Sequence, residues 1–410
     1  MLGGAHFSPF IASELPDGRD RALANRLVTT ALQRQGHINL MLPYLLERGL
    51  PKKSGSFEAV LRLALTQLIY LPEIGAHSAI FLAVEALKRD QRAAHLAKLA
   101  NAVLRRAQAE AENLRQAPAE LLFPELLRQS WAEGYGAENL GRFAEALIAP
   151  VPLDIVLKET EPGLAEALGG VALGADVVRV ETRDRSVEAL PGYAEGKWWV
   201  QDFAATLPAR LVDLPPGARV LDLCAAPGGK TAQLIKAGYR VTSVDDDAER
   251  VKRLRANLDR LGYGAEIVEA DAAAFMSDEK FDAVLLDAPC SATGTFRRHP
   301  EVTWQRGADI SGRVALQRRL IANAAECLRS GGVLVYCVCS LEPEEGEAQA
   351  QWVFDALPAL EPMPINPADF PIFPEAINAA GQLRTHPGMA APHAAGGMLD
   401  GFFAARFRLR

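Results

Sequence analysis

Residues 219–231 read R-V-L-D-L-C-A-A-P-G-G-K-T, and this stretch decides the fold. Residues 220–223 form a short apolar run that is typical of a buried parallel strand. The run ends before a Pro-Gly-Gly turn at 227–229, and an apolar helical pattern begins at Thr231. A strand, a glycine turn and a helix in this order let the backbone approach a ligand at the helix N-terminus. The stretch therefore predicts a cofactor-binding turn.

The same stretch indicates which cofactor is bound. Gly229-Lys230-Thr231 matches the end of the phosphate loop G-x-x-x-x-G-K-[ST], but Cys224 stands where that motif requires its first glycine. The dinucleotide motif G-x-G-x-x-G is also absent. A strand that carries Asp222 before a glycine turn suits S-adenosylmethionine, whose amino-acid end needs polar contacts without a pyrophosphate cradle. An ordinary glycine-rich turn without a ligand is the alternative at this point.

The composition narrows the class of protein. The chain has 410 residues, of which 49% are hydrophobic and 23% charged, as expected of a soluble protein with two or three domains. No apolar run approaches the roughly 18 residues of a membrane span, and no secretory signal is visible. Five cysteines without zinc spacing predict reduced thiols, no metal and a cytoplasmic location. The net charge of -7 argues against nonspecific coating of nucleic acid but leaves room for a local basic groove.

The patterning divides the chain into three predicted domains. Residues 1–126 read as an all-helical domain, and residues 127–205 as a small α/β connecting segment with strand-like and helix-like pieces. Residues 206–410 alternate strands with helices, which predicts a Rossmann-like, doubly wound parallel sheet. The adjacent Trp198 and Trp199 favour packing over base stacking.

Polar residues follow the predicted strands of the third domain. The strands expected are Val220–Leu223, Arg240–Val244, Ala265–Glu269, Ala283–Leu286 and Val333–Val338. Ligands bind at the carboxyl ends of such strands. Asp245 then suits a hydrogen bond to ribose hydroxyls, and Asp271 suits the adenine amino group.

Two further strand ends carry thiols. Asp287-Ala288-Pro289-Cys290-Ser291 ends one strand, and Tyr336-Cys337-Val338-Cys339-Ser340 ends the next. Free cysteines are commonly small buried core residues. This interpretation suits Cys327 and Cys224 better than Cys290 and Cys339.

A thiol at this place suits methylation of carbon 5 of a pyrimidine. That carbon becomes nucleophilic when a thiolate adds to carbon 6, and an acid that hydrogen-bonds N3 stabilises the developing charge. Cationic Lys230 could help to lower the pKa of the thiol. A methyltransferase that acts on amino groups needs no thiol and would carry Asn/Asp-Pro-Pro-aromatic in place of Asp-Ala-Pro-Cys.

Four motifs carry a family resemblance. L-D-L-C-A-A-P-G-G-K-T, L-L-D-A-P-C-S-A-T-G-T-F-R-R-H-P, Y-C-V-C-S-L-E-P-E-E and the late D-G-F-F resemble the Sun/Nop2-type RNA (cytosine-5-)-methyltransferases. The helical domain resembles NusB, an RNA-binding factor, with residues 1–18 in place of part of one NusB helix. The resemblance implies S-adenosylmethionine-dependent methylation of a cytosine in 16S ribosomal RNA through a covalent cysteine–C6 adduct, by a protein expected to be monomeric.

The resemblance also implies a role for individual residues. Cys339 would be the nucleophile, Cys290 would promote elimination of the product, and Asp287 would reach both cofactor and base. The residues expected to hold S-adenosylmethionine are Cys224, Ala225, Ala226, Pro227, Gly228, Gly229, Lys230, Asp245, Asp271 and Asp287. Lys230, Arg297, Arg298 and His299 are expected to contact RNA.

The chain departs from the family pattern beside the nucleophile. Val338 replaces the usual Thr, and Cys337 lies two residues before Cys339, on the same strand face. Cys337 could therefore be mistaken for the reactive thiol or form a disulfide with a displaced Cys339. Motif position favours Cys339 as the nucleophile.

Two other functions stay open from the sequence. One is the same chemistry on transfer RNA or on DNA, where Cys290 could be the nucleophile. The other is a non-catalytic RNA-binding assembly factor, against which the glycine turn, the acids and both thiols argue.

Overall fold

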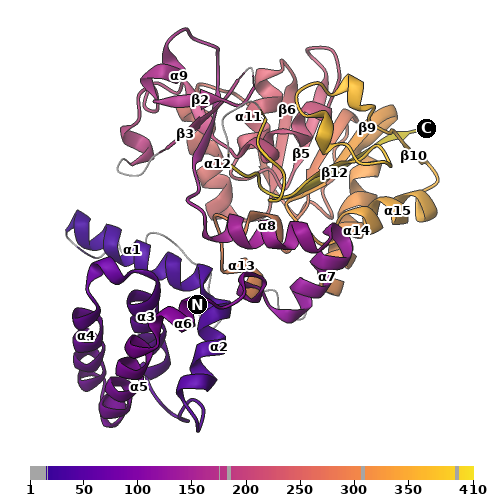
Figure 1. Ribbon diagram of the computed structural model, residues 1–410. Coiled ribbons are helices and arrows are strands. Elements are labelled where there is room, and N and C mark those ends of the chain that lie inside the picture. Colours follow the sequence, from indigo (N-terminus) through magenta and orange to yellow (C-terminus); the bar gives the residue numbers. More distant parts are fainter. Residues whose placement is uncertain (1–14, 16, 175, 182–185, 306–309, 393–396) are drawn as a thin grey trace. The chain divides into compact units, whose positions relative to one another are not determined.

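The chain folds into two compact units. In this computed structural model the first unit comprises residues 1–149 and 298–305, and the second comprises 150–297 and 306–410 (Figure 1). The residues that the structure describes are 15, 17–174, 176–181, 186–305, 310–392 and 397–410. Most of the N-terminal segment 1–18 thus lies outside the described residues.

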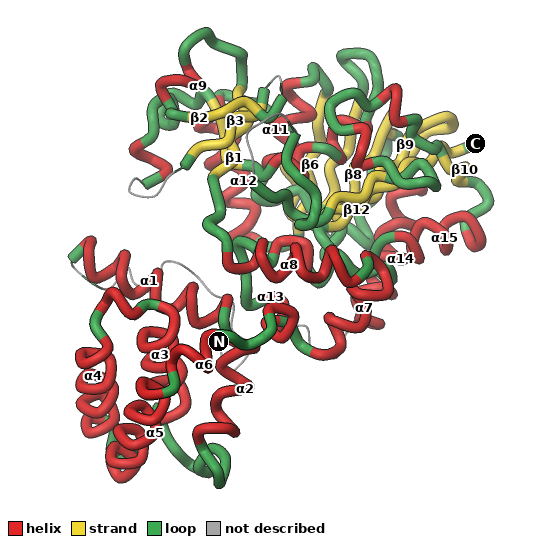
Figure 2. The backbone as a smooth tube through the Cα atoms, viewed as in Figure 1, coloured by secondary structure: helices red, strands yellow, loops and turns green. Residues whose placement is uncertain are grey.

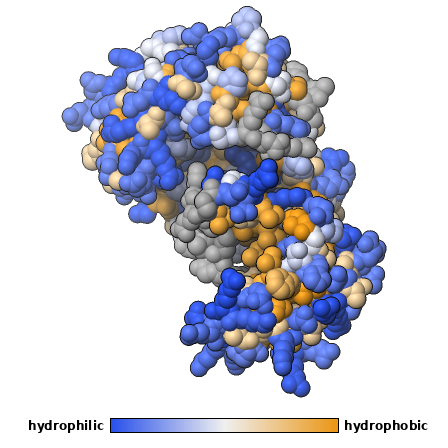
Figure 3. Space-filling view, turned by 90° about the vertical axis from the view of Figure 1, so that its left-hand side faces the viewer, coloured by the Kyte–Doolittle hydropathy of each residue, from blue (hydrophilic) through white to orange (hydrophobic). Residues whose placement is uncertain are grey.

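The first unit is helical, as predicted. Its helices are α1 (Gly18–Gln33), α2 (Gln35–Leu45), α3 (Phe57–Tyr70), α4 (Ala76–Arg89), α5 (Ala97–Ala109), α6 (Ala111–Arg115), α7 (Glu125–Tyr135), α8 (Ala137–Ile148) and the short α13 (Val302–Gln305). Leu61 and Leu65 recur at helical spacing on α3 and are fully buried, so α3 forms the centre of the bundle. Apolar side chains also gather on part of this unit's surface (Figure 3), and the exposed apolar residues of the unit include Phe81 and Leu82.

Helices α7 and α8 pack through aromatic side chains. The rings of Trp131 and Phe143 are both fully buried, with centroids 5.6 Å apart in an edge-to-face arrangement. These helices cluster with the first unit although they follow the predicted boundary at residue 126. The three-domain division stays a prediction, since the structure groups the chain into two units.

A small antiparallel sheet begins the second unit. Its strands are β1 (Leu153–Leu157), β2 (Gly170–Ala172), β3 (Val177–Val180) and β4 (Trp198–Val200), in the order β2-β3-β1-β4, with α9 (Leu164–Ala167) beside them. Trp198 and Trp199 are both buried, in agreement with the packing role predicted for them.

The main sheet of the second unit has the order β10-β12-β9-β8-β5-β6-β7, with β11 beside β12. Its strands are β5 (Arg219–Leu223), β6 (Arg240–Asp245), β7 (Glu266–Glu269), β8 (Phe281–Asp287), β9 (Leu328–Val338), β10 (Leu360–Pro362), β11 (Leu383–Thr385) and β12 (Phe402–Leu409). The helices of this region are α10 (Phe203–Thr206), α11 (Gly229–Lys236), α12 (Ala248–Leu261), α14 (Ile310–Cys327) and α15 (Glu347–Ala356). Figure 2 shows the twisted sheet with helices around it.

The predicted parallel sheet is correct for five strands and incomplete for the rest. Strands β7, β6, β5, β8 and β9 pair in parallel, whereas β12 returns antiparallel to β9 and also pairs with β10 and β11. Because the strand order reverses between β5 and β8, their carboxyl ends form the crevice in which such folds bind ligands.

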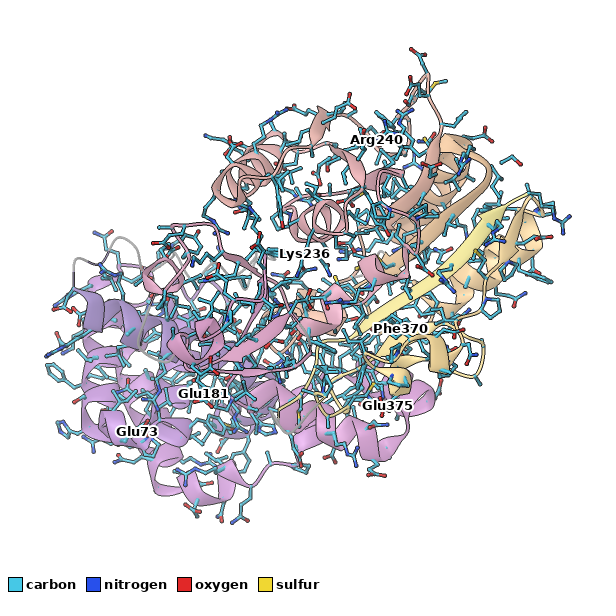
Figure 4. All side chains as sticks on the ribbon, turned by 90° about the horizontal axis from the view of Figure 1, so that it is seen from above. Glu73, Glu181, Lys236, Arg240, Phe370 and Glu375 are labelled. Carbon is cyan, nitrogen blue, oxygen red and sulfur yellow. The ribbon has the colours of Figure 1, made fainter. Side chains whose placement is uncertain are left out.

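Polar contacts from α11 connect the small sheet to the region of the main sheet. Lys236 (labelled in Figure 4), at the end of α11, donates to the carbonyl of Leu157 at 2.6 Å and to Asp176 Oδ2 at 2.7 Å. Within the small sheet, Arg179 of β3 pairs with Asp154 of β1 through two hydrogen bonds of 2.7 and 2.9 Å.

Candidate active site

The loop between β5 and α11 lies at the crevice. Its backbone takes left-handed angles at Cys224, where φ is 60°, and at Gly228, where φ is 102°. A Cβ atom on Gly228 would lie 2.5 Å from a methyl carbon of Leu254, so this position requires glycine. The loop otherwise carries only small residues, which leaves backbone amides at the N-terminus of α11 close to the strand edge.

The acids predicted to hold the cofactor lie at the ends of the next two strands of the sheet. Asp245 ends β6, is almost fully buried, and accepts a hydrogen bond of 3.0 Å from Ala226 N while pairing with Arg250 at 3.3 Å. Asp271 follows β7, is exposed, and accepts from Ala273 N at 2.8 Å. A backbone turn free of bulky side chains and two carboxylates at adjacent strand ends fit S-adenosylmethionine, which offers an amino-acid end, ribose hydroxyls and an adenine amino group.

Asp287 and Lys230 form an ion pair at the end of β8. Lys230 Nζ lies 2.8 Å from Asp287 Oδ2 and 4.9 Å from the centre of the Phe402 ring. Burial disfavours the charge of Lys230, but Asp287 and the sulfurs of Cys337 and Cys339 outweigh burial and raise the pKa of Lys230 above its ordinary value. Lys230 therefore keeps its positive charge close to the thiols of Cys337 and Cys339.

The two thiols predicted to be functional lie side by side. Cys290 Sγ is 3.5 Å from Cys339 Sγ, although the residues are 49 positions apart. The hydrogen bond with Cys339, burial, and the charges of Cys339 and Glu345 raise the pKa of Cys290 well above its ordinary value. The site thus holds Cys290 as a neutral thiol next to Cys339.

Cys337 contacts the site through Asp287. Its thiol is fully buried and donates to Asp287 Oδ1 at 3.5 Å. Burial and the neighbouring carboxylate of Asp287 raise the pKa of Cys337 well above its ordinary value. All five cysteines are free in this structure, which therefore contains no disulfide between Cys337 and Cys339.

The remaining cysteines behave as expected of core residues. Cys327 is buried at the end of α14, and its sulfur lies 3.8 Å from the carbonyl of Phe275. Cys224 is half-buried at the glycine loop, where burial raises its pKa. Neither has the paired arrangement of Cys290 and Cys339.

Two of the predicted RNA contacts lie in the interior. Lys230 is buried against Asp287, and Arg297 is only 4% exposed, with Asp400 at 3.3 Å and Asp202 at 3.9 Å. The prediction that Arg297 meets phosphate is wrong for this structure, because two carboxylates already surround the buried guanidinium. Arg298 and His299 are exposed.

Sequence reasoning missed two side chains that bear on the site. Phe402, in the D-G-F-F motif, faces Lys230, and Glu345, in the L-E-P-E-E motif, contacts the loops of both thiols. Both residues belong to motifs that carry the family resemblance, but nothing in the spacing of these motifs distinguishes a side chain that faces the site from one that faces solvent.

Within the described ranges, no helix combines the length and apolarity needed to cross a bilayer. Among the same residues, no group of three or more His, Cys, Asp or Glu side chains is arranged to hold a metal ion.

Comparisons with known proteins agree with this geometry. The profile described as "16S rRNA methyltransferase RsmB/F" matches residues 209–408, and the NusB family profile matches residues 9–109. Ribosomal RNA small subunit methyltransferase B of Xanthomonas campestris is 37% identical over 354 residues, which cover 82% of this chain and 79% of that protein. The protein of the same name from Pseudomonas putida is 35% identical, with 84% of each chain covered.

A solved structure extends the likeness to three dimensions. The methyltransferase homologue from Pyrococcus horikoshii superposes with a TM-score of 0.57 and 27% identity, over 71% of this chain and 98% of that one. The identity with both curated relatives and the length that they share show that this chain belongs to the 16S rRNA methyltransferase RsmB/F family and is an S-adenosylmethionine-dependent RNA methyltransferase.

Proposed function

We propose that this enzyme methylates carbon 5 of a cytosine in 16S ribosomal RNA, with Cys339 as the nucleophile and Cys290 as the thiol that assists release. The observation that carries the proposal is the 3.5 Å contact between the two sulfurs, at the strand ends beside the cofactor loop. Methylation of an amino group would use neither thiol. The names of the family and of the curated relatives support 16S ribosomal RNA as the substrate.

The proposed reaction begins at Cys339. Its thiolate forms a bond to carbon 6 of the cytosine, and the electron pair of the 5,6 double bond moves to carbon 5. The positive charge of Lys230 stabilises the thiolate, and Asp287, held by Lys230 at 2.8 Å, is the side chain proposed to hydrogen-bond the base. S-adenosylmethionine supplies the methyl group that carbon 5 attacks.

The reaction ends with elimination of Cys339. The proton on carbon 5 passes to a water molecule, the electrons of that C–H bond restore the double bond, and the C6–S bond breaks to return the thiolate. Cys290 is in hydrogen-bond contact with Cys339 and is held as a neutral thiol, so it can protonate or hydrogen-bond the departing sulfur.

The oligomeric state, the location in the cell and the RNA contacts are also part of the proposal. We propose that the protein acts as a monomer in the cytoplasm, and that Arg298 and His299, both exposed, contact RNA phosphate. Lys230 acts on the substrate through Asp287 and the thiols.

The test is transfer of labelled methyl from S-adenosylmethionine to protein-free 16S ribosomal RNA, followed by nucleoside analysis. Wild type should place the label in 5-methylcytosine, Cys339→Ala should abolish transfer, and Cys290→Ala should accumulate a covalent protein–RNA adduct. Cys327→Ala is the matched control, because it removes a buried thiol outside the site. Full turnover by Cys339→Ala would contradict the mechanism.

Each substrate outcome also has a defined meaning. Label in transfer RNA alone would keep the mechanism and replace the substrate. Absence of transfer to any nucleic acid, with RNA binding preserved, would favour an assembly factor over an enzyme of this reaction.

A further inference from the structure

Glu345 is a fully buried carboxylate that lies outside the reacting groups. It belongs to the turn between β9 and α15 and is 0% exposed. Its Oε2 atom accepts from Ser291 Oγ at 2.5 Å and from Ser340 Oγ at 2.7 Å, and its Oε1 atom accepts from Ser291 N at 3.0 Å and from Gln317 Nε2 at 3.1 Å. Every one of these hydrogen-bond partners is neutral, and together they stabilise the carboxylate in the interior.

The partners of Glu345 are the neighbours of the two reactive thiols. Ser291 directly follows Cys290, and Ser340 directly follows Cys339. A single carboxylate therefore holds the residue after each thiol, on two loops far apart in the sequence. The two serine hydroxyls also contact each other at 3.0 Å.

Glu345 is itself held in place by the fold. Tyr336 in β9 donates from its hydroxyl to the carbonyl of Glu345 at 2.6 Å, and Gln317 reaches the carboxylate from α14. Through these contacts the positions of β9 and α14 fix the position of Glu345, and Glu345 in turn fixes the loops that carry Ser291 and Ser340. A charged acceptor between several donors is also a stronger support than a neutral one.

We propose that Glu345 is a positioning residue that sets the separation of the Cys290 and Cys339 thiols by binding Ser291 and Ser340 at once. Its contribution to turnover rests on the proposed function, whereas its effect on the spacing of the thiols does not. Spacing decides whether Cys290 can reach the departing sulfur, because catalytic groups that act together must be held to within a fraction of an ångström.

The direct test measures the spacing without any RNA. Phenylarsine oxide condenses with two thiols, forming two As–S bonds and releasing one water, so it binds tightly only where two thiols lie close together. Its dissociation constant is measured on the full chain for wild type, Glu345→Gln and Glu344→Gln, with mass spectrometry to identify the modified peptides. Cys290→Ala gives the value for a site that lacks the pair.

Glu345→Gln places an amide NH₂ group among donors and removes the charge, so at least one hydrogen bond to the loops is lost. We expect arsenical affinity to fall about tenfold or more, the factor that corresponds to one charge-assisted hydrogen bond. Glu344→Gln, at the adjacent exposed position, should keep the wild-type affinity. Should Glu345→Gln not fold, Ser291→Ala removes one hydroxyl donor and is expected to give a smaller loss in the same direction.

A second measurement separates positioning from general support of the fold. In the methyl transfer assay, run at a temperature at which every variant is folded, Glu345→Gln should lower kcat, leave the KM for S-adenosylmethionine unchanged and increase the fraction of enzyme trapped on RNA. Arsenical affinity equal to wild type in Glu345→Gln or Ser291→Ala, or absent in wild type itself, would overturn the proposal. If wild type transfers no methyl group but the arsenical series behaves as expected, the proposed function fails and the positioning role stands.

Discussion

The ion pair of Lys230 and Asp287 allows a quantitative test of the site. Its atoms are 2.8 Å apart, and the two side chains are 9% and 31% exposed. At this distance and an effective dielectric constant of about 20, the attraction is about 6 kcal/mol before the cost of removing both charges from water. Removal of one partner of a buried pair typically costs about 3–5 kcal/mol, and the partial exposure of Asp287 places this pair near the lower value.

We therefore expect a strong coupling in a double-mutant cycle. Lys230→Met should lower the free energy of unfolding by about 3 kcal/mol and Asp287→Asn by about 2 kcal/mol, whereas the double variant should cost about 2 kcal/mol less than their sum. The assay is urea unfolding at pH 7.5, restricted to the transition that added S-adenosylmethionine moves to higher urea, because that transition belongs to the cofactor-binding unit.

A matched pair controls for distance. Lys197 and Glu161 belong to the same unit and are 2.6 Å apart, but their side chains are 39% and 42% exposed, so the same cycle there should show little or no coupling. Additive effects of Lys230→Met and Asp287→Asn, to within about 0.5 kcal/mol, would refute the conclusion that the buried pair acts as a unit.

Two further predictions follow from the strand β5 and its loop. Burial raises the pKa of Asp222 to about 7, so the folded state holds a proton that the unfolded state releases near pH 4, and stability should fall as pH rises between these values. Asp222→Asn should remove most of this pH dependence, measured by urea unfolding at pH 5 and pH 8; an unchanged slope would show that other groups cause it. Gly228→Ala should weaken S-adenosylmethionine binding in calorimetry and cost about 1–3 kcal/mol of stability because φ is 102° there, whereas Gly264→Ala, where nothing lies within 4 Å of an added Cβ, should do neither. Equal effects of the two glycine variants would contradict this.

The features that local sequence determines were predictable. An apolar run followed by Pro-Gly-Gly led correctly to β5, the loop and α11, because strand burial and the glycine turn are both local. The thiols of Cys290 and Cys339 were likewise placed together, since the carboxyl ends of adjacent parallel strands meet at one edge of a sheet.

The features that depend on distant partners were not predictable. Strand β12 pairs antiparallel with β9, and a motif such as D-G-F-F does not state which strand it will join. Arg297 looks like a surface charge in F-R-R-H-P, yet Asp202 and Asp400, each about a hundred residues away in sequence, surround it in the interior. A cationic side chain is buried only where the fold supplies the opposite charge, and the fold's long-range contacts are what a single sequence leaves open.

Long-range contacts also explain how two thiols in similar sequence positions can take different roles. Sequence places Cys290 and Cys339 alike, each before a serine at a strand end. In the folded protein the two thiols interact with different charged groups: Lys230 interacts with Cys337 and Cys339, and Glu345 interacts with Cys290. A positive neighbour favours the thiolate needed for attack on carbon 6, and a negative neighbour favours the thiol needed for elimination. Since neither charge belongs to the strand that carries the thiol it acts on, the division of labour that we propose is a property of the tertiary structure.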